Sequence, residues 1–373
     1  MLSQVEWGEY KIGELFIPLK GRKKLTKEDL SPDGDVDVYS SDTTNNGIMG
    51  QTELDADYIV DHATPLYLIF GDHTRAMHIA TSDFCVMDNV KVLVPKFKKV
   101  ETLLFICSAW QKAIPQLGYC RHWTKAQNVK FFLPTKNGEI DFDFMERFVA
   151  ELEAQRVAEL EAYLTATGLK DYELTAAEQK ALDDFENNSG SNWQEFKLID
   201  IFKVKNTQCI LSRDVEAKEN GTPYLCASAD NNAISSYISY NEKYLDKGNC
   251  IFIGGKTFVV TYQKNDFYSN DSHNLALYLK DSKNATLITQ LFCISCIKCG
   301  LGYKYSWGDS ISFKKIQNDI IQLPVKKGKI DFEFMAIFIS AIQKQTIKDV
   351  VQYSDRKIAA TKQCCKDVTE SER

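Results

Sequence analysis

The sequence predicts an α+β protein of two strand-rich domains in tandem repeat, each followed by a long helix, with the two helices paired as a coiled coil. Three observations lead to this prediction. An internal repeat spans nearly the whole chain, the first part of each copy has the composition of strands, and the last part has a helical spacing of apolar residues.

The repeat rests on four matching segments that occur in the same order in both copies. WGEYKIGELF from Trp7 matches WQEFKLIDIF from Trp193, and LGYCRHW from Leu117 matches LGYKYSW from Leu301. KAQN then matches KIQN, and LPTKNGEIDFDFM matches LPVKKGKIDFEFM. Agreement in order with small drifts in spacing indicates two diverged copies of one unit.

The first part of each copy is rich in Tyr, Val, Ile, Phe and Thr, and turn signals interrupt it at Ser31-Pro32-Asp33-Gly34 and Asn45-Asn46-Gly47. The last part changes character. Apolar residues at three-four spacing predict helices over residues 141–166 and 331–362, each roughly 40 Å long at 1.5 Å per residue. Asp141 and Asp331 precede these helices, where a carboxylate can cap free amides.

A long helix with a narrow apolar stripe needs a partner, and the helix of the other copy is the obvious one. The alternative is that each helix packs onto its own domain. We expect the following segments: a first strand-rich domain at 1–138, a first long helix at 139–168, a short helix and linker at 169–192, a second strand-rich domain at 193–328, a second long helix at 329–365, and a tail at 366–373.

Composition excludes several classes of protein. With 44% hydrophobic and 26% charged residues, the 373-residue chain is neither disordered nor fibrous. The sequence has no apolar run long enough for a membrane span and no signal-peptide pattern at its start, so we expect a cytoplasmic protein without a membrane partner. Eleven irregularly spaced cysteines suit reduced thiols.

The net charge of −6 argues against a nucleic-acid binder until it is divided along the chain. Residues 139–186 contain 14 acidic and 4 basic residues, a charge of −10, so the rest of the chain carries +4. The acidity therefore belongs to the helical spacer. Lys125 and Lys315 recur beside an aromatic motif in both copies, which favours phosphate contact over a merely solvated surface.

Signatures of catalysis are missing. The sequence has no glycine-rich phosphate loop, no nucleophile elbow and no His-Glu-x-x-His helix, so we predict a binding protein without catalytic or metal-ligating residues. Cys293, Cys296 and Cys299 have the spacing of iron-sulfur ligands, but buried apolar thiols explain them better. An enzyme with an unrecognised site remains an alternative.

One polar cluster follows an apolar strand: IFGDHTRAM at 69–77, with IFIGGKTF at 251–258 in the second copy. Such side chains suit the reading of base edges, and the alternative is a loop that caps its own backbone. The paired asparagines have the same two interpretations, a turn or a base contact. The residues that we predict to contact DNA are Arg22, Lys23, Lys24, Asn45, Asn46, Asp72, His73, Thr74, Arg75, Arg121, His122, Lys125, Asn231, Asn232, Lys256, Lys304 and Lys315.

With these motifs in both copies, the chain resembles the specificity subunits of type I restriction-modification systems over nearly its whole length. The resemblance implies that each target-recognition domain reads one half of a split site in double-stranded DNA, while the helices pair antiparallel and fix the gap. It also implies docking of two DNA methyltransferase subunits and, through them, a restriction subunit. S-adenosylmethionine, magnesium and ATP would then be ligands of those partners, with no cofactor in this chain.

The same segments also resemble specificity subunits of type IIB systems, which pair with a fused nuclease-methyltransferase. The two copies differ at the cluster, GDHTR against GGKTF, so we expect an asymmetric bipartite target. A coiled-coil adaptor that binds only protein is the alternative from another class.

Overall fold

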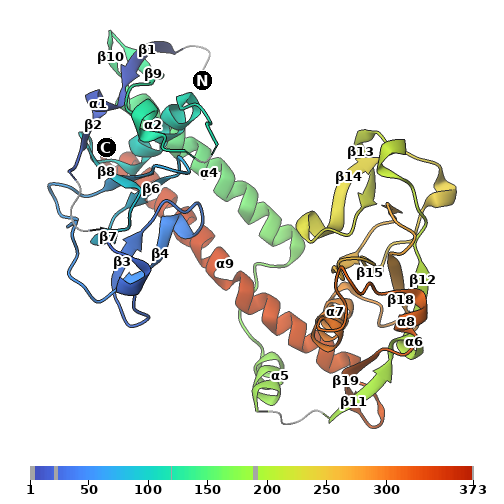
Figure 1. Ribbon diagram of the computed structural model, residues 1–373. Coiled ribbons are helices and arrows are strands. Elements are labelled where there is room, and N and C mark those ends of the chain that lie inside the picture. The colour runs from blue at the N-terminus through green and yellow to red at the C-terminus, as the bar shows by residue number, and fades with distance from the viewer. Residues whose placement is uncertain (1–4, 21–23, 119, 188–191, 372–373) are drawn as a thin grey trace. The chain divides into compact units, whose positions relative to one another are not determined.

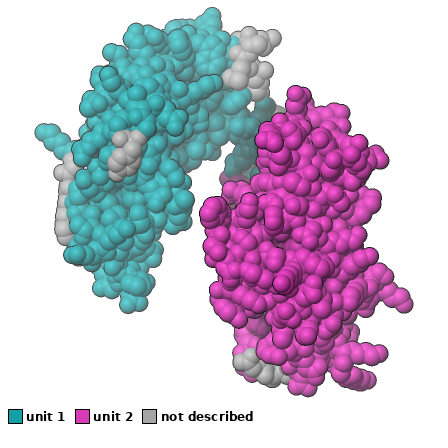
Figure 2. Space-filling view, turned by 45° about the vertical axis from the view of Figure 1, so that its right-hand side comes forward, with its two compact units in different colours: residues 1–160, 360–373 teal, residues 161–359 magenta. Residues whose placement is uncertain are grey.

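The computed structural model describes residues 5–20, 24–118, 120–187 and 192–371. The chain divides into two compact units, coloured separately in Figure 2. Unit 1 contains residues 1–160 and 360–373, and unit 2 contains residues 161–359. Each unit carries one copy of the repeat.

The elements of the first copy, most of which are labelled in Figure 1, are β1 (Glu6–Lys11), α1 (Ile12–Leu15), β2 (Phe16–Pro18), η2 (Lys27–Asp29), β3 (Val36–Tyr39), η3 (Asn45–Gly47), β4 (Ile48–Thr52), β5 (Tyr67–Gly71), β6 (Met77–Ala80), β7 (Phe84–Val86), β8 (Val90–Pro95), α2 (Val100–Ala113), α3 (Trp123–Ala126), β9 (Lys130–Lys136), β10 (Glu139–Ile140) and α4 (Phe142–Thr167).

The second copy repeats this order after an additional helix, α5. Its elements are α5 (Ala176–Glu186), β11 (Asn192–Lys197), α6 (Leu198–Ile201), β12 (Phe202–Asn206), η4 (Ser212–Asp214), β13 (Ala217–Leu225), η5 (Asp230–Ala233), β14 (Ile234–Ile238), η6 (Glu242–Tyr244), β15 (Cys250–Ile253), β16 (Val260–Gln263), β17 (Tyr268–Ser269), β18 (Leu275–Leu279), α7 (Leu287–Leu301), α8 (Phe313–Ile316), β19 (Ile320–Lys326), β20 (Lys329–Ile330) and α9 (Phe332–Ser371).

The sheets confirm the repeat. Unit 1 has sheets of order β1-β9-β10, β2-β8-β5-β6 and β4-β3-β7, and unit 2 has β11-β19-β20, β12-β18-β15-β16 and β14-β13-β17. Strands β3 and β7 pair in parallel, as do β13 and β17. The order and direction of the strands are therefore the same in both copies, which confirms the predicted tandem of strand-rich domains.

The repeated opening and closing motifs pair with each other. Trp7 lies opposite Pro134 in the β1–β9 ladder, and Trp193 lies opposite Pro324 in the β11–β19 ladder. A tight turn with positive φ at Asn137 and Gly138 follows β9. The two ends of each domain are thus joined before the long helix begins.

Asp141 and Asp331 cap the long helices, as predicted. The Asp141 carboxylate accepts a hydrogen bond from the Phe144 backbone N–H at 2.9 Å, and Asp331 accepts one from Phe334 at 3.0 Å. These oxygens satisfy amides that have no partner within the first turn of a helix. The carboxylates thereby fix where each helix starts.

In each domain one helix packs on the four-stranded sheet and forms the main core with it. This helix is α2 in unit 1 and α7 in unit 2. In unit 1 the fully buried Trp110 of α2 lies 5.3 Å from Phe70 of β5, measured between ring centroids, and its indole N–H donates to the Ala126 carbonyl at 2.9 Å. A buried Trp is stable here because its polar atom has this partner.

In unit 2 both predicted modes of helix packing occur in different parts of α9. Its first turns pack on their own domain, where Met335 is buried in the core and Phe338 contacts Phe292. Further along, the Ser354 hydroxyl donates to Glu161 near the end of α4 at 3.5 Å, and the Ser340 hydroxyl donates to Glu178 of α5 at 2.6 Å. Residue numbers fall along α9 as they rise from α4 to α5, so the packing is antiparallel.

No helix in the described part of the chain is both long enough and apolar enough to cross a membrane.

Glu178 joins α5 to α9 through a buried polar cluster. Its backbone N–H and carboxylate form a capping box with Thr175, and its carboxylate also binds Ser340 and the Lys344 ammonium, the latter at 3.1 Å. Burial acts to raise the pKa of this carboxyl, but the hydrogen bonds from Ser340, Thr175 and Lys344 outweigh it and lower the pKa to about 2. The cluster therefore contributes stability while Glu178 is ionised.

We expect Glu178→Gln to lower the free energy of unfolding at pH 7 on the order of 1 kcal/mol, because the charge-assisted bonds are lost. The pKa of Glu178 is lower in the folded chain than its ordinary value of 4.5, so its contribution is present above that pH and is lost as pH falls toward about 2. Denaturant unfolding from pH 7 to pH 3 measures both effects. The exposed Glu186→Gln on the same helix is the control, and an equal loss in both variants would refute this role.

Candidate nucleic-acid interface

The polar cluster after β5 is a short loop whose backbone closes on itself. The Gly71 N–H donates to the Ala76 carbonyl at 2.8 Å, and the Arg75 N–H donates to the Gly71 carbonyl at 2.9 Å. Arg75 has φ of +61°, a left-handed conformation that non-glycine residues rarely adopt. We call residues 71–76 the first reading loop.

The second copy forms the same loop with different side chains. The Gly254 N–H donates to the Val259 carbonyl at 2.8 Å, and the Phe258 N–H donates to the Gly254 carbonyl at 2.9 Å. Phe258 also has positive φ, +54°. We call residues 254–259 the second reading loop. In the strand registers Tyr67 lies opposite Ala80 and Cys250 opposite Gln263, which makes Phe258 the counterpart of Arg75 and Lys256 the counterpart of His73.

One threonine ties each reading loop to the loop that precedes the asparagine turn. The Thr74 hydroxyl donates to the Ser41 carbonyl at 2.7 Å, and the Thr257 hydroxyl donates to the Ala227 carbonyl at 2.8 Å. Sequence comparison did not single out Ser41 or Ala227, because a backbone acceptor leaves no side-chain signal.

The paired asparagines form turns in both copies. Asn45 and Asn46 have φ of +45° and +49°, and Asn231 and Asn232 have +45° and +53°. Asparagine tolerates this conformation better than most residues. The side-chain amides of all four donate to backbone carbonyls, which are those of Ile48, Ile79, Ile234 and Tyr262. All four asparagines therefore lie in turns, and their contact with bases stays a prediction.

Two residues predicted to contact DNA are buried, and the structure corrects that prediction. Asp72 is 2% exposed and its carboxylate accepts a hydrogen bond from the Trp123 N–H at 2.7 Å. His122 is 1% exposed, its backbone N–H donates to the Asp72 carbonyl at 2.9 Å, and its Nδ1 lies 3.1 Å from the same oxygen. Both residues hold the first reading loop against α3 instead of facing solvent.

The remaining loop side chains reach the surface to different extents. Thr74 is exposed, whereas His73 and Arg75 are half-buried. One guanidinium nitrogen of Arg75 donates to the Ile114 carbonyl at 2.8 Å, which orients the rest of the group. In the second reading loop Lys256 is exposed and its ammonium lies 3.1 Å from the Asp271 carboxylate.

The basic residues of the first copy that were predicted to contact DNA differ in exposure. Arg121 and Lys125 are exposed in unit 1. Lys24 is half-buried and its ammonium donates to the Val90 carbonyl at 3.2 Å, while burial first and then the nearby Lys91 lower its pKa. A lysine held in this way suits phosphate contact less well than an exposed one. Arg22 and Lys23 lie outside the described residues.

The three lysines of the second copy that were predicted to contact DNA, Lys256, Lys304 and Lys315, are paired with acids. Lys304 binds the buried carboxylate of Asp319, and Lys315 binds Asp309 and donates to the Ser310 carbonyl at 2.8 Å. These pairs leave less positive charge at the surface of unit 2 than the sequence suggests.

The aromatic motif also needs a correction. The sequence match LGYCRHW with LGYKYSW sets Trp123 beside Trp307, but Trp123 begins α3 and the structurally equivalent helix α8 begins at Phe313. The second copy has twelve residues between Gly302 and Lys315, where the first has six between Gly118 and Lys125. Trp307 therefore lies in an insertion that unit 1 lacks.

The three cysteines of the run lie on one helix. Cys293, Cys296 and Cys299 lie along α7, the first buried and the last exposed. Burial raises the pKa of the Cys293 thiol and raises that of Cys296 to about 12. Across the described ranges, no group of three or more His, Cys, Asp or Glu residues is placed to hold a metal ion.

Comparison with known proteins gives one family. The family model described as "Type I restriction modification DNA specificity domain" matches residues 4–162 and 190–353. A relative named "Type II restriction enzyme BgcI specificity subunit S.BcgI", from Heyndrickxia coagulans, is 21% identical over 359 residues, which cover 93% of this chain and 97% of the relative.

One solved structure supports the fold with a TM-score above 0.5. The type I restriction-modification system S subunit from M. genitalium has a TM-score of 0.59 at 12% identity, covering 96% of this chain and 93% of that one. The HsdS subunit from Thermoanaerobacter tengcongensis has a TM-score of 0.32 at 18% identity, covering 94% and 91%. With both copies of the repeat matched by the family model, this chain belongs to the type I restriction modification DNA specificity domain family, whose members recognise DNA sequence.

Proposed function

We propose that this chain is the non-catalytic specificity subunit of a restriction-modification complex and that each unit reads one half of a bipartite site in double-stranded DNA. The observation that carries the proposal is the repeated reading loop. The same backbone bonds and the same threonine tie present different side chains, His73 and Arg75 in one copy, Lys256 and Phe258 in the other. Two related domains that recognise different DNA sequences need the same loop backbone with different side chains on it.

We assign base contacts to the exposed parts of the reading loops. Arg75 keeps guanidinium donors beyond the one bound to Ile114, and Arg or Lys donors match the acceptors of guanine in the major groove. We assign phosphate contacts to the exposed Arg121 and Lys125, since such contacts supply much of the affinity and orient the protein. Arg22 and Lys23 keep the same role as sequence predictions.

The different loop tips support an asymmetric target whose half-sites differ in sequence. The antiparallel packing of α9 on the end of α4 supports the helices as the spacer that fixes the gap between half-sites. A rigid helical spacer converts helix length into a number of base pairs, since each residue adds 1.5 Å.

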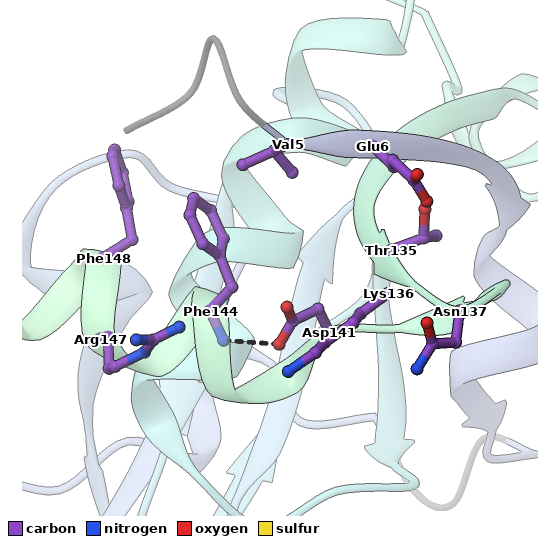
Figure 3. Close-up of a pocket in the computed structure, with 9 residues that line it drawn as sticks. All are labelled: Val5, Glu6, Thr135, Lys136, Asn137, Asp141, Phe144, Arg147 and Phe148. Atoms are coloured by element: carbon purple, nitrogen blue, oxygen red, sulfur yellow. Dashed lines mark hydrogen bonds between the residues drawn. The ribbon is translucent and has the colours of Figure 1, made fainter.

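The first turns of α4 offer a docking surface for a DNA methyltransferase subunit. A cavity of about 490 Å³ is lined by Val5, Arg147 and the rings of Phe144 and Phe148, which project from the same side of the helix in Figure 3. In unit 2 the equivalent ring, Phe338, is covered by Phe185 of α5 at 4.7 Å between centroids. Aromatic and arginine side chains at one surface favour a protein partner.

In this proposal the methyltransferase and restriction subunits hold S-adenosylmethionine, magnesium and ATP. The relative named as a Type II specificity subunit supports a type IIB assembly, with one fused nuclease-methyltransferase, as the second candidate. Co-purification of the chain with its partners separates the two assemblies, because type I gives separate methyltransferase and restriction polypeptides.

Selection of random-sequence duplex DNA by the chain assembled with its methyltransferase tests the proposed function. We expect enrichment of two different short motifs at a fixed separation. A palindromic or continuous motif would refute the asymmetric bipartite site, and no enrichment would favour the protein-binding adaptor.

We expect Lys256→Ala to abolish selection at one half-site and to leave the other unchanged, because Lys256 belongs to one reading loop only. Sequencing of the selected duplexes measures this directly. Lys283→Ala, an exposed lysine of the same unit outside the loop, is the matched control. Equal weakening of both half-sites by Lys256→Ala would count against base reading.

We expect Lys125→Ala to weaken binding to every duplex by a similar factor. It should also reduce the slope of log affinity against log salt by about one unit, because one phosphate contact releases about one counterion. Titrations at several salt concentrations with selected and random duplexes measure the slope. An unchanged slope would show that Lys125 makes no phosphate contact.

A further inference from the structure

A tight turn in unit 2 holds the indole of Trp307 in solvent. The Ser306 N–H donates to the Asp309 carbonyl at 3.3 Å and the Asp309 N–H donates back to Ser306 at 3.1 Å, which leaves Trp307 and Gly308 at the tip. Trp307 is 79% exposed. Tryptophan is highly buried on average, because its exposure leaves a large apolar ring in water.

We call residues 305–309 the hairpin. Contacts with Asp319 hold the residues at its base. Tyr305 is buried and its hydroxyl donates to the Asp319 carboxylate at 2.5 Å, and the same carboxylate binds Lys304. Lys315 binds Asp309 at the other side of the turn. These contacts hold both ends of the turn, and Trp307 at its tip is left exposed. A rigid, exposed aromatic loses little conformational freedom on binding.

The hairpin adjoins the second reading loop. The rings of Tyr305 and Phe258 lie 5.3 Å apart between centroids, so the base of the hairpin packs against the second reading loop. Unit 1 places the corresponding segment against its own loop, where Arg75 binds the Ile114 carbonyl and Asp72 binds the Trp123 N–H. Lys314 in α8 is also exposed and adds positive charge to this region.

We propose that Trp307 contacts duplex DNA at the half-site read by unit 2, with its indole against a base step or a sugar. Apolar side chains do this in proteins that insert a wedge between base steps, and base–aromatic contact is tolerant of sequence. Duplex DNA fits better than a protein partner because the base of the hairpin packs against the second reading loop and because the exposed Lys314 follows the hairpin in the chain. The inference rests on the proposed function and deepens it, since unit 1 has no such insertion.

The test uses the full chain assembled with its methyltransferase and a duplex that carries the selected site. We expect Trp307→Ala to weaken binding about tenfold, which corresponds to ~1.4 kcal/mol, with the salt slope unchanged because no charge is lost. Trp307→Phe should restore most of the affinity. Leu287→Ala, an exposed apolar residue at the opposite end of α7 from the hairpin, is the control and should bind as the wild type does.

A fluorescent base analogue, 2-aminopurine, reports direct contact. Placed in the half-site of unit 2, it should change its emission with the wild-type chain and not with Trp307→Ala. Wild-type affinity and emission in Trp307→Ala would overturn the inference alone. Loss of assembly with the methyltransferase, with DNA binding by the chain unchanged, would overturn it by assigning the tip to a protein contact. If the wild-type complex selects no sequence, the proposed function fails and the inference with it.

Discussion

Each domain begins and ends on the same antiparallel pair of strands, and the rest of the molecule depends on that pairing. In unit 1 the β1–β9 ladder brings the two ends of the domain together, and the Asp141 N–H donates to the Pro134 carbonyl of β9 at 2.9 Å. Unit 2 repeats the arrangement, with Asp331 bound to Pro324 at 2.8 Å. The closing strand, the turn and the helix cap are thus one continuous unit, which explains why the thirteen-residue motif LPTKNGEIDFDFM recurs.

In a domain closed in this way, the paired strands and the aspartate cap fix the start of the long helix, so the loops can change without disturbing that start. The reading loops illustrate this independence. Gly71 and Gly254 make the same backbone bonds, and Thr74 and Thr257 make the same tie, while the positions between them differ in charge and size. The insertion that carries Trp307 is a larger change of the same kind, confined to one connection between α7 and α8. The same strand topology therefore allows the backbone of the domain to stay constant while its loop side chains vary.

The repeat made much of this fold predictable. Matching motifs at nearly constant offset gave the two domains, and helical spacing gave α4 and α9 with their aspartate caps. The burial of polar side chains was harder to predict from the sequence, because polarity alone does not show whether a residue faces solvent or a backbone amide. Asp72 and His122 were predicted at the surface for that reason, although each satisfies polar groups inside unit 1. The insertion that carries Trp307 could not be recognised from the repeat, because LGYKYSW matches LGYCRHW and so pairs Trp307 with Trp123. In the structure the counterpart of Trp123 is Phe313, the first residue of α8.

The net charge of the chain does not describe the charge near the reading loops, because many charged side chains are paired with one another. Within the acidic spacer segment, Glu161 is bound by Lys170, and Asp171 and Glu178 are bound by Lys344, so part of the negative charge holds the spacer together. At physiological salt a charge is screened beyond about 8 Å, so DNA at a reading loop senses nearby lysines and not the total of −6. In unit 2 those lysines are themselves paired, as Lys304 is with Asp319 and Lys256 with Asp271. In the proposed function, this pairing reduces the electrostatic part of the DNA affinity of unit 2 and gives more weight to contacts that need no charge.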